Sequence, residues 1–264
     1  MAPDFDNRRA VLNHPDYFLA WRTRCEAMSR QPTARLALRY APAERAALDW
    51  FPARTRGRPI VAFVHGGYWQ WNSRQEFAFV AEGLQSLDLN VAVLGYPLAP
   101  AARLPTIVTH IRQACDWLIT NAAGLGASPR LYLSGWSAGA HLCAAVLDDP
   151  RLSGAVCISG IYVLAPLRGT AIDQVLGLSD RDIDTLSPAL AQLSHSCPVL
   201  LACGQLELPE LKRQTRHYDE VRRNAHLPTT LSMVAACNHY SVLETYARPD
   251  GILLAEAAAL YGWH

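Results

Sequence analysis

The chain has 264 residues, of which half are hydrophobic and 18% are charged, and its formal net charge is +1 at pH 7. This composition is typical of a compact protein with a large buried core, and it argues against a disordered chain. A charge so close to zero gives no field that would recruit nucleic acid or an anionic membrane, so we expect a small-molecule partner. The length favours one domain over residues 1–264 rather than two independent domains.

Sequence signals for secretion, membrane insertion and metal binding are missing. The initial MAPDFDNRRA has neither the basic start nor the apolar run of a secretory signal, and no apolar stretch has the roughly 18 residues that a membrane span needs. The seven cysteines are scattered without a C-x-x-C pair, which favours reduced, buried thiols over disulfides or a structural zinc site. We therefore expect a cytoplasmic protein without a metal, with a homodimer as an open alternative to a monomer.

The predicted elements begin with an N-terminal arm over residues 1–39. The arm contains a helix over Asp16–Ser29 and leads into a hairpin of two strands, Ala34–Arg39 and Ala46–Trp50, with Pro42 in the turn. This hairpin precedes the segment in which strands and helices alternate.

Short apolar runs then alternate with helical stretches. The expected strands are Ile60–His65, Val91–Gly95, Leu131–Ser134, Ala155–Ser159, Val199–Cys203 and Thr229–Val234. The expected helices are Ser73–Leu87, Pro105–Asn121, Ala138–Leu147, Pro209–Asn224 and Gly251–Tyr261, with further helices of a small cap inserted at about 166–193. This alternation predicts an α/β protein with a mostly parallel sheet and helices on both of its faces.

A candidate nucleophile lies between a predicted strand and a predicted helix. The segment Gly135-Trp136-Ser137-Ala138-Gly139 has the form G-x-S-x-G and stands at the strand-to-helix turn. Such a turn exposes the serine hydroxyl, and the following helix N-terminus favours negative charge beside it. The alternative is a glycine-rich packing turn without chemistry.

A candidate oxyanion hole follows the strand Ile60–His65 in the segment His65-Gly66-Gly67-Tyr68-Trp69. Acyl transfer needs backbone N–H groups aimed at the oxygen of the tetrahedral intermediate, and glycines let the backbone approach closely. We expect the donors to be Gly66, Gly67 and Ala138, the residue after the serine. The alternative, a phosphate-binding loop, lacks the G-x-x-x-x-G-K-[ST] pattern. His65 is expected to hold the loop by hydrogen bonding.

His239 is the best candidate base among nine histidines, because it follows the last predicted strand at the sheet edge where Ser137 emerges. The others lie near the termini, on polar helix surfaces, on the packed serine helix or at the opposite sheet edge: His14, His264, His110, His217, His226, His141 and His195. The acid should fall between serine and histidine in the chain, and Glu207 follows the strand Val199–Cys203. Glu210 remains an alternative, although it has entered the next helix.

These segments resemble the arylformamidases, also called kynurenine formamidases, which are α/β-hydrolases. The resemblance runs from about Tyr40 to the C-terminus and is carried by four stretches: His65-Gly66-Gly67-Tyr68-Trp69-Gln70, Ser137-Ala138-Gly139-Ala140-His141-Leu142, Ser159-Gly160-Ile161-Tyr162 and Gly204-Gln205-Leu206-Glu207-Leu208-Pro209-Glu210. It implies the α/β-hydrolase fold and a catalytic triad of Ser137, Glu207 and His239. Glu207 stands where animal members of the family carry aspartate. Val163 stands directly after Gly160-Ile161-Tyr162, at a position where family members often have an aspartate.

The resemblance implies hydrolysis of an N-formyl arylamine, with N-formyl-L-kynurenine giving kynurenine and formate. No cofactor is expected, because the chain itself supplies nucleophile, base and oxyanion donors. An aromatic substrate pocket is expected from residues near the motifs: Tyr68, Trp69, Trp71, Trp136 and Tyr162. Ordinary core packing is the alternative for each. A broader esterase or carbamate-type amidase and a non-catalytic ligand-binding protein remain the other functional hypotheses.

Overall fold

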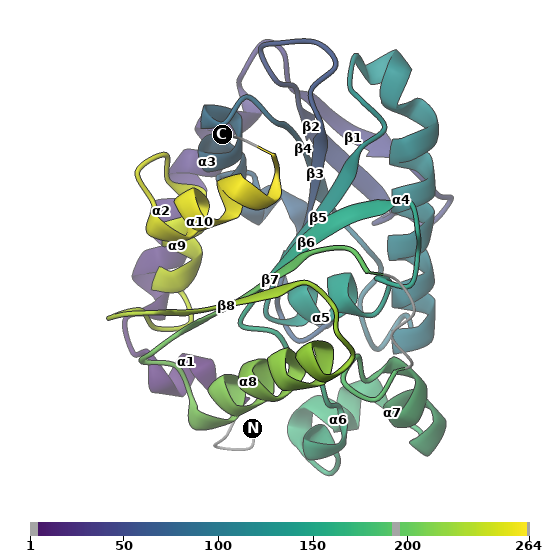
Figure 1. Cartoon of the computed structure of the whole chain (residues 1–264), viewed down its shortest axis with the longest axis vertical. Helices are drawn as coiled ribbons and strands as arrows, with labels where there is room; N and C mark the ends of the chain where they lie inside the picture. The colour runs from purple at the N-terminus through teal and green to yellow at the C-terminus, as the bar shows by residue number, and fades with distance from the viewer. Residues whose placement is uncertain (1–4, 192–195, 263–264) are drawn as a thin grey trace.

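An eight-stranded sheet runs through the middle of the molecule (Figure 1), seen in a computed structural model that describes residues 5–191 and 196–262. In chain order the strands are β1 (Arg35–Arg39), β2 (Ala47–Phe51), β3 (Ile60–Val64), β4 (Asn90–Leu94), β5 (Leu131–Trp136), β6 (Leu152–Ile158), β7 (Val199–Gly204) and β8 (Thr229–Val234). Their spatial order is β1-β2-β4-β3-β5-β6-β7-β8. The six strands β4, β3, β5, β6, β7 and β8 are parallel to their neighbours in this order, whereas β2 pairs antiparallel with both β1 and β4.

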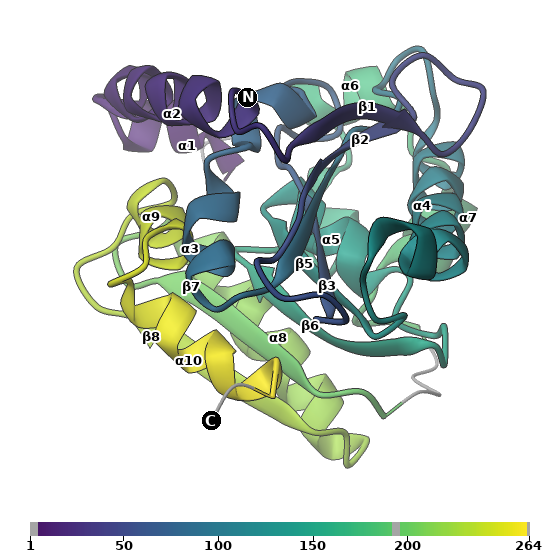
Figure 2. The ribbon, with the colours of Figure 1, turned by 90° about the horizontal axis from the view of Figure 1, so that it is seen from above.

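Helices cover both faces of the sheet (Figure 2), which confirms the predicted architecture. One face carries α4 (Leu104–Leu125), α5 (Ala138–Ala144) and α8 (Pro209–Asn224). The other carries α2 (His14–Ser29), α3 (Val80–Ser86), α9 (Ser241–Ala247) and α10 (Ile252–Leu260). Because side chains alternate along a strand, Ile60, Ala62 and Val64 of β3 enter the first core and its remaining residues enter the second. Because both faces of the central strands are buried, their sequences are unbroken apolar runs.

The N-terminal arm packs on this body at two places. Its short helix α1 (Asn7–Ala10) lies close to the loop after β3, and the longer α2 buries Trp21, which stacks on Phe79 with ring centroids 4.7 Å apart. The predicted hairpin is present as β1 and β2 and forms one end of the sheet. Neither α1 nor α9 is predicted from sequence.

The predicted helix Ser73–Leu87 is interrupted, and this prediction is wrong in its middle. A 3-10 helix, η2 (Arg74–Phe77), is followed by a change of direction before α3. All five residues from Phe77 to Ala81 are buried. The burial of five consecutive residues places this segment between other elements rather than on the surface as an amphipathic helix.

The segment after β6 that was predicted as a cap contains η3 (Ala165–Leu167), α6 (Ala171–Leu176) and α7 (Asp180–Leu186). Its last predicted residues, 192 and 193, fall outside the described ranges, as do His195 and His264. Across the ranges that are described, no helix combines the length and the apolar character needed to cross a membrane.

Helix α5 approaches β3 so closely that only glycine fits between them. A Cβ on Gly139 would lie 2.0 Å from the carbonyl oxygen of Val64, whereas a Cβ on Gly124 of α4 would meet no atom within 4 Å. The contact fixes α5 and hence the turn that precedes it.

We expect Gly139→Ala to lower the free energy of unfolding by about 3 kcal/mol, since backbone on both sides must shift. The matched control Gly124→Ala should leave it unchanged or raise it by up to about 1 kcal/mol, because alanine favours the helix. Urea unfolding monitored by circular dichroism measures both. Equal effects of the two substitutions would contradict the close packing of α5.

Candidate functional site

The three predicted catalytic residues emerge at one edge of the sheet. Ser137 follows β5, Glu207 follows β7 and His239 follows β8. These strands belong to the parallel part of the sheet, so their carboxyl ends meet at a common edge. Ligands bind at this edge in open α/β sheets.

Ser137 occupies a strained turn between β5 and α5. Its φ of 57° and ψ of −121° are unfavourable for a residue with a side chain, and its amide donates to the carbonyl of Ile158 at 2.8 Å. The Ser137 side chain is thereby presented at the start of α5, where the first amide groups have no partner within the helix. This geometry is the strand–turn–helix arrangement that the G-x-S-x-G segment predicts.

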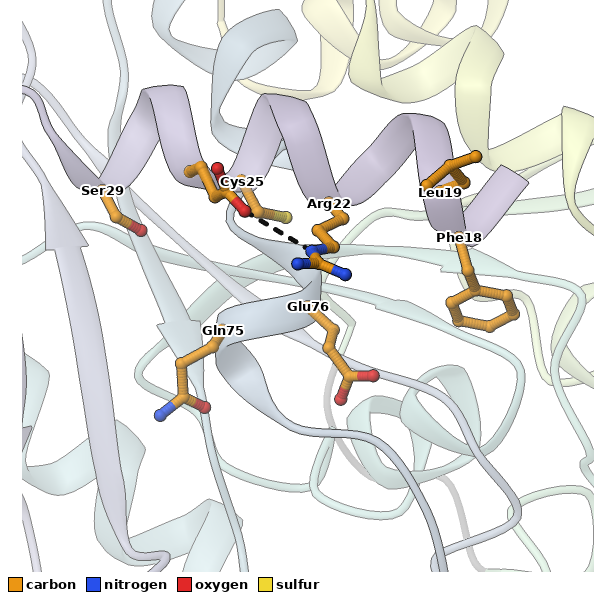
Figure 3. A pocket seen from close by; sticks show the side chains of 8 residues that line it. Phe18, Leu19, Arg22, Cys25, Ser29, Gln75 and Glu76 are labelled. Carbon is orange, nitrogen blue, oxygen red and sulfur yellow. Dashed lines mark hydrogen bonds and ion pairs between the residues drawn. The ribbon is translucent and has the colours of Figure 1, made fainter. Parts of the chain in front are cut away.

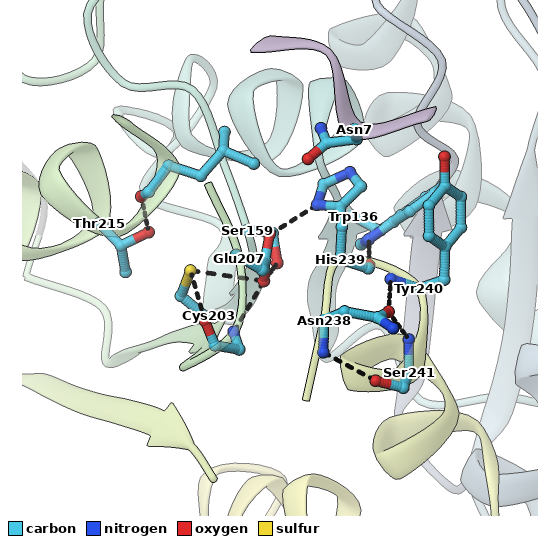
Figure 4. Close-up of polar contacts among 12 residues, drawn as sticks. Asn7, Trp136, Ser159, Cys203, Glu207, Thr215, Asn238, His239, Tyr240 and Ser241 are labelled. Carbon is cyan, nitrogen blue, oxygen red and sulfur yellow. Dashed lines mark hydrogen bonds and ion pairs between the residues drawn. The ribbon is translucent and has the colours of Figure 1, made fainter. Parts of the chain in front are cut away.

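Glu207 and His239 form a short contact between two loops (Figure 4). The His239 Nδ1 lies 2.6 Å from Oε2 of Glu207, and both side chains are buried. Oε1 of the same carboxylate accepts from the Ser159 hydroxyl at 2.5 Å and from the Gly204 amide at 2.7 Å. Both carboxylate oxygens are thus engaged.

These contacts keep Glu207 ionised. Burial alone would raise the pKa of its carboxyl, but the charge and hydrogen bond of His239, with the donors Ser159 and Gly204, outweigh that effect and lower the pKa below its ordinary value. A carboxylate beside Nδ1 favours the tautomer in which Nδ1 carries the proton. Nε2 is then free to accept a proton from a hydroxyl.

The loop that carries His239 is itself held in place. The Asn238 side chain accepts from the amides of Tyr240 and Ser241, both at 2.9 Å, and starts the helical turn into α9. The Trp136 indole donates to the His239 carbonyl at 2.9 Å, and its ring lies 4.7 Å from the imidazole. The residue before the candidate nucleophile therefore positions the candidate base.

A small cavity of about 30 Å³ brings Ser137 and His239 together. It is lined by residues from four parts of the chain: Asn7, Arg8, Phe18, Gly67, Tyr68, Trp71, Asn72, Trp136, Ser137, His239 and Tyr240. The volume suffices for about one water molecule. The N-terminal arm thus closes the site from one side.

The glycine loop after β3 lies against the serine turn. A Cβ on Gly66 would lie 3.0 Å from that of Ser137, and Gly67 has a φ of +116°, which side chains disfavour. The Asn72 side-chain amide donates a hydrogen bond to the Gly66 carbonyl at 3.2 Å. In the described part of the chain, no group accepts a hydrogen bond from the backbone N–H of Gly66 or Gly67. Together with Ala138, these amides are available to an oxyanion.

The predicted aromatic wall divides into two groups. Tyr68, Trp71 and Trp136 line the cavity with Ser137. Trp69 is buried with its ring edge on His141, and Tyr162 is buried and stacks on Tyr218 with centroids 4.5 Å apart. Neither Trp69 nor Tyr162 lines the cavity as it stands, and a role for them in substrate binding stays a prediction.

Two further histidines are fully buried without reaching the cavity. His65 Nδ1 contacts the Gly66 carbonyl at 2.8 Å, and burial lowers the pKa of this imidazole to about 3. His141 Nε2 contacts the Leu186 carbonyl at 2.8 Å, and burial lowers its pKa to about 4. Both rings are therefore neutral structural groups at neutral pH, and His65 holds the glycine loop as expected.

A larger cavity of about 550 Å³ lies between α2 and η2 (Figure 3). Its wall contains Leu19, Cys25 and an exposed pair of Arg22 with Glu26. Phe18 lines this cavity and also the smaller one at Ser137. Phe18 is therefore shared by the linings of the two cavities.

Sequence reasoning missed several groups at the site. Ser159 was noted only as part of a strand end, although the positive φ of 54° turns the chain there and its hydroxyl reaches Glu207. Asn7 and Arg8 come from the N-terminal arm, where nothing in the local pattern pointed to the site. Among the residues with a described position, no cluster of three potential metal ligands occurs.

Comparison with known proteins agrees with this fold. The α/β hydrolase fold family matches residues 61–175. The kynurenine formamidase of Danio rerio is 33% identical, over 70% of this chain and 67% of that protein, and the one of Salmo salar is 30% identical, over 73% and 69%. A crystal structure of a proposed thioesterase from Silicibacter superimposes with a TM-score of 0.86 at 27% identity, covering 96% of both chains.

The identity to the two fish enzymes extends over more than two thirds of each chain, and the fold is that of known hydrolases. The chain therefore belongs to the kynurenine formamidase family of α/β-hydrolases and is a hydrolase.

Proposed function

We propose that the protein hydrolyses the formamide of an N-formyl arylamine, with N-formyl-L-kynurenine as substrate, through Ser137, His239 and Glu207. The observation that carries the proposal is the buried contact of Glu207 with His239. His239 and Ser137 line the same cavity. The family membership supports a formamide as the scissile bond.

In the first step, the Ser137 hydroxyl attacks the formyl carbon while His239 Nε2 takes the hydroxyl proton. The carbonyl oxygen becomes an oxyanion that the amides of Gly66, Gly67 and Ala138 stabilise. The ionised Glu207 stabilises the imidazolium that forms. When the tetrahedral intermediate collapses, the imidazolium gives its proton to the aniline nitrogen, and the arylamine leaves.

In the second step, water attacks the formyl ester on Ser137. His239 takes a proton from that water and returns it to the serine oxygen as formate leaves. No cofactor is needed in this sequence, because each proton and electron pair moves between substrate, water and side chains of the chain. The aromatic side chains of Tyr68, Trp71 and Trp136 are suited to contact the aryl ring.

A substrate of this size must first enlarge the cavity. Sites for small organic molecules measure about 300–1,000 Å³, well above the 30 Å³ at Ser137. Because Phe18 lines both this space and the 550 Å³ cavity, we expect that rotation of its ring joins the two. We propose that the aryl group enters as Phe18 moves.

The second candidate function is a broader aryl esterase or carbamate hydrolase, which would use the same serine, base and oxyanion donors. We expect the protein to turn over N-formyl-L-kynurenine with a higher kcat/KM than simple aryl esters such as p-nitrophenyl acetate. Steady-state assays on both substrates decide between the two, and a strong ester preference would reject the formamidase proposal.

Ser137→Ala should lower kcat for every substrate by roughly 10⁵-fold or more, because the nucleophile is lost. Burst-phase kinetics with p-nitrophenyl acetate and wild-type protein should reveal the acyl-enzyme, and the variant should show no burst. Retention of hydrolysis in a folded Ser137→Ala protein would eliminate the serine mechanism.

Glu207→Gln should lower kcat about 10³-fold or more, since the imidazolium loses its carboxylate and the favoured tautomer changes. The matched control is Glu210→Gln, three residues away. Glu210 pairs with Arg213 at 2.6 Å, away from the cavity, and its loss should change kcat less than about threefold. The reverse ranking would assign the acid to Glu210.

Phe18→Ala should open the wall between the two cavities and favour large substrates. We expect kcat/KM for a naphthyl ester to rise about threefold or more relative to p-nitrophenyl acetate. Leu19→Ala is the control, because Leu19 lines only the larger cavity and is 67% exposed. An unchanged substrate ratio in Phe18→Ala would show that the aryl group enters elsewhere.

A further inference from the structure

Arg8 is the one permanently charged residue in the lining of the cavity at Ser137, as far as the described residues show. The other lining groups are aromatic, amide, glycine, serine and histidine residues. Arg8 is exposed to solvent, so its guanidinium can meet a ligand without first being freed from the core.

The position of Arg8 is fixed from two sides. Its guanidinium lies over the ring of Trp71, 4.5 Å from the centroid, which is a cation–π contact. Its backbone belongs to α1, where the buried Asn7 side chain donates to the Tyr68 hydroxyl at 2.9 Å and that hydroxyl donates to the Phe5 carbonyl. Tyr68 stands in the glycine loop, so Arg8 is tied to the oxyanion donors.

The charge of Arg8 is not neutralised by a neighbour. The nearest acid in sequence, Asp6, instead accepts from the backbone amide of Arg9 at 3.1 Å. Within the described ranges no carboxylate forms an ion pair with Arg8. Burial raises the pKa of the Tyr240 hydroxyl to about 12, with Arg8 opposing that rise and Asp6 adding to it.

An arginine with free donor edges, beside an aromatic-lined catalytic cavity, is suited to a planar anion. We propose that Arg8 binds the α-carboxylate of an amino-acid substrate and so selects N-formyl amino-acid arylamines over neutral aryl amides and esters. This inference rests on the proposed function, because it concerns the same site. It makes Arg8 a specificity-determining residue at the end of the substrate remote from the formamide.

The test compares N-formyl-L-kynurenine with its carboxamide, which keeps the aryl formamide and the amino group but lacks the negative charge. Wild-type protein should prefer the carboxylate by about 10- to 100-fold in kcat/KM. Arg8→Gln should reduce that preference to about twofold, mainly by raising KM for the carboxylate, with kcat little changed. Arg8→Lys should keep an intermediate preference.

The matched control is Arg9→Gln, an exposed arginine on the same helix that does not line the cavity. Its substrate preference should equal that of wild-type protein, and thermal unfolding should show that all variants are folded. Equal losses for both substrates in Arg8→Gln, or the same collapse of preference in Arg9→Gln, would overturn the assignment of Arg8.

A second measurement does not depend on formamide cleavage. L-kynurenine should inhibit p-nitrophenyl acetate hydrolysis about tenfold more strongly in wild-type protein than in Arg8→Gln, whereas kynurenine carboxamide should inhibit both alike. If neither formamide is cleaved but this difference persists, the formamidase proposal fails and the carboxylate site stands. If the formamide is cleaved and no difference is found, the carboxylate site fails alone.

Discussion

A carboxylate without access to water is stable only when charge and hydrogen-bond donors surround it. Glu207 imposes this constraint on the edge of the sheet where Ser137 and His239 lie. Its partners are Ser159 after β6, Gly204 at the end of β7 and His239 after β8. One buried side chain therefore fixes three loops relative to one another. A slip of one residue in the pairing of these strands would turn the partners to the wrong face and leave the charge uncompensated.

A second set of contacts joins the N-terminal arm to this edge. Asn7 and Tyr68, which are 61 residues apart, form a buried hydrogen bond, and Phe18 packs its ring edge on Tyr240 with centroids 5.9 Å apart. The central sheet supplies the reacting groups, whereas the arm supplies one wall of the space around them. Under the proposed function, chemistry and substrate selection therefore reside largely in different parts of the chain.

The sequence suffices to predict the parts of the molecule that have local signals. Apolar runs mark the buried strands, and the turn after β5 places Ser137 because glycine and alanine surround it. Chain order then points to Glu207 and His239. The reacting edge is predictable because parallel strands bring their carboxyl ends together.

The remaining features depend on contacts between distant segments. Arg8 and Asn7 lie in a stretch without periodicity, and only the folded chain places them beside Ser137. The directions of Trp69 and Ser159 depend on left-handed backbone conformations, with φ values of 60° and 54°. Residues of these types seldom adopt such angles, so proximity in sequence is a poor guide to which aromatic side chains reach the cavity.

The link from Tyr68 to α1 holds the beginning of the described chain beside the cavity at Ser137. Most chain ends tolerate fusion partners and substitutions because little depends on them. Here, α1 lines the cavity through Asn7 and Arg8, whereas α10 contributes no residue to that lining. Substitutions in α1 would therefore change one wall of the cavity, whereas substitutions at buried positions of α2 such as Trp21 would also disturb the core.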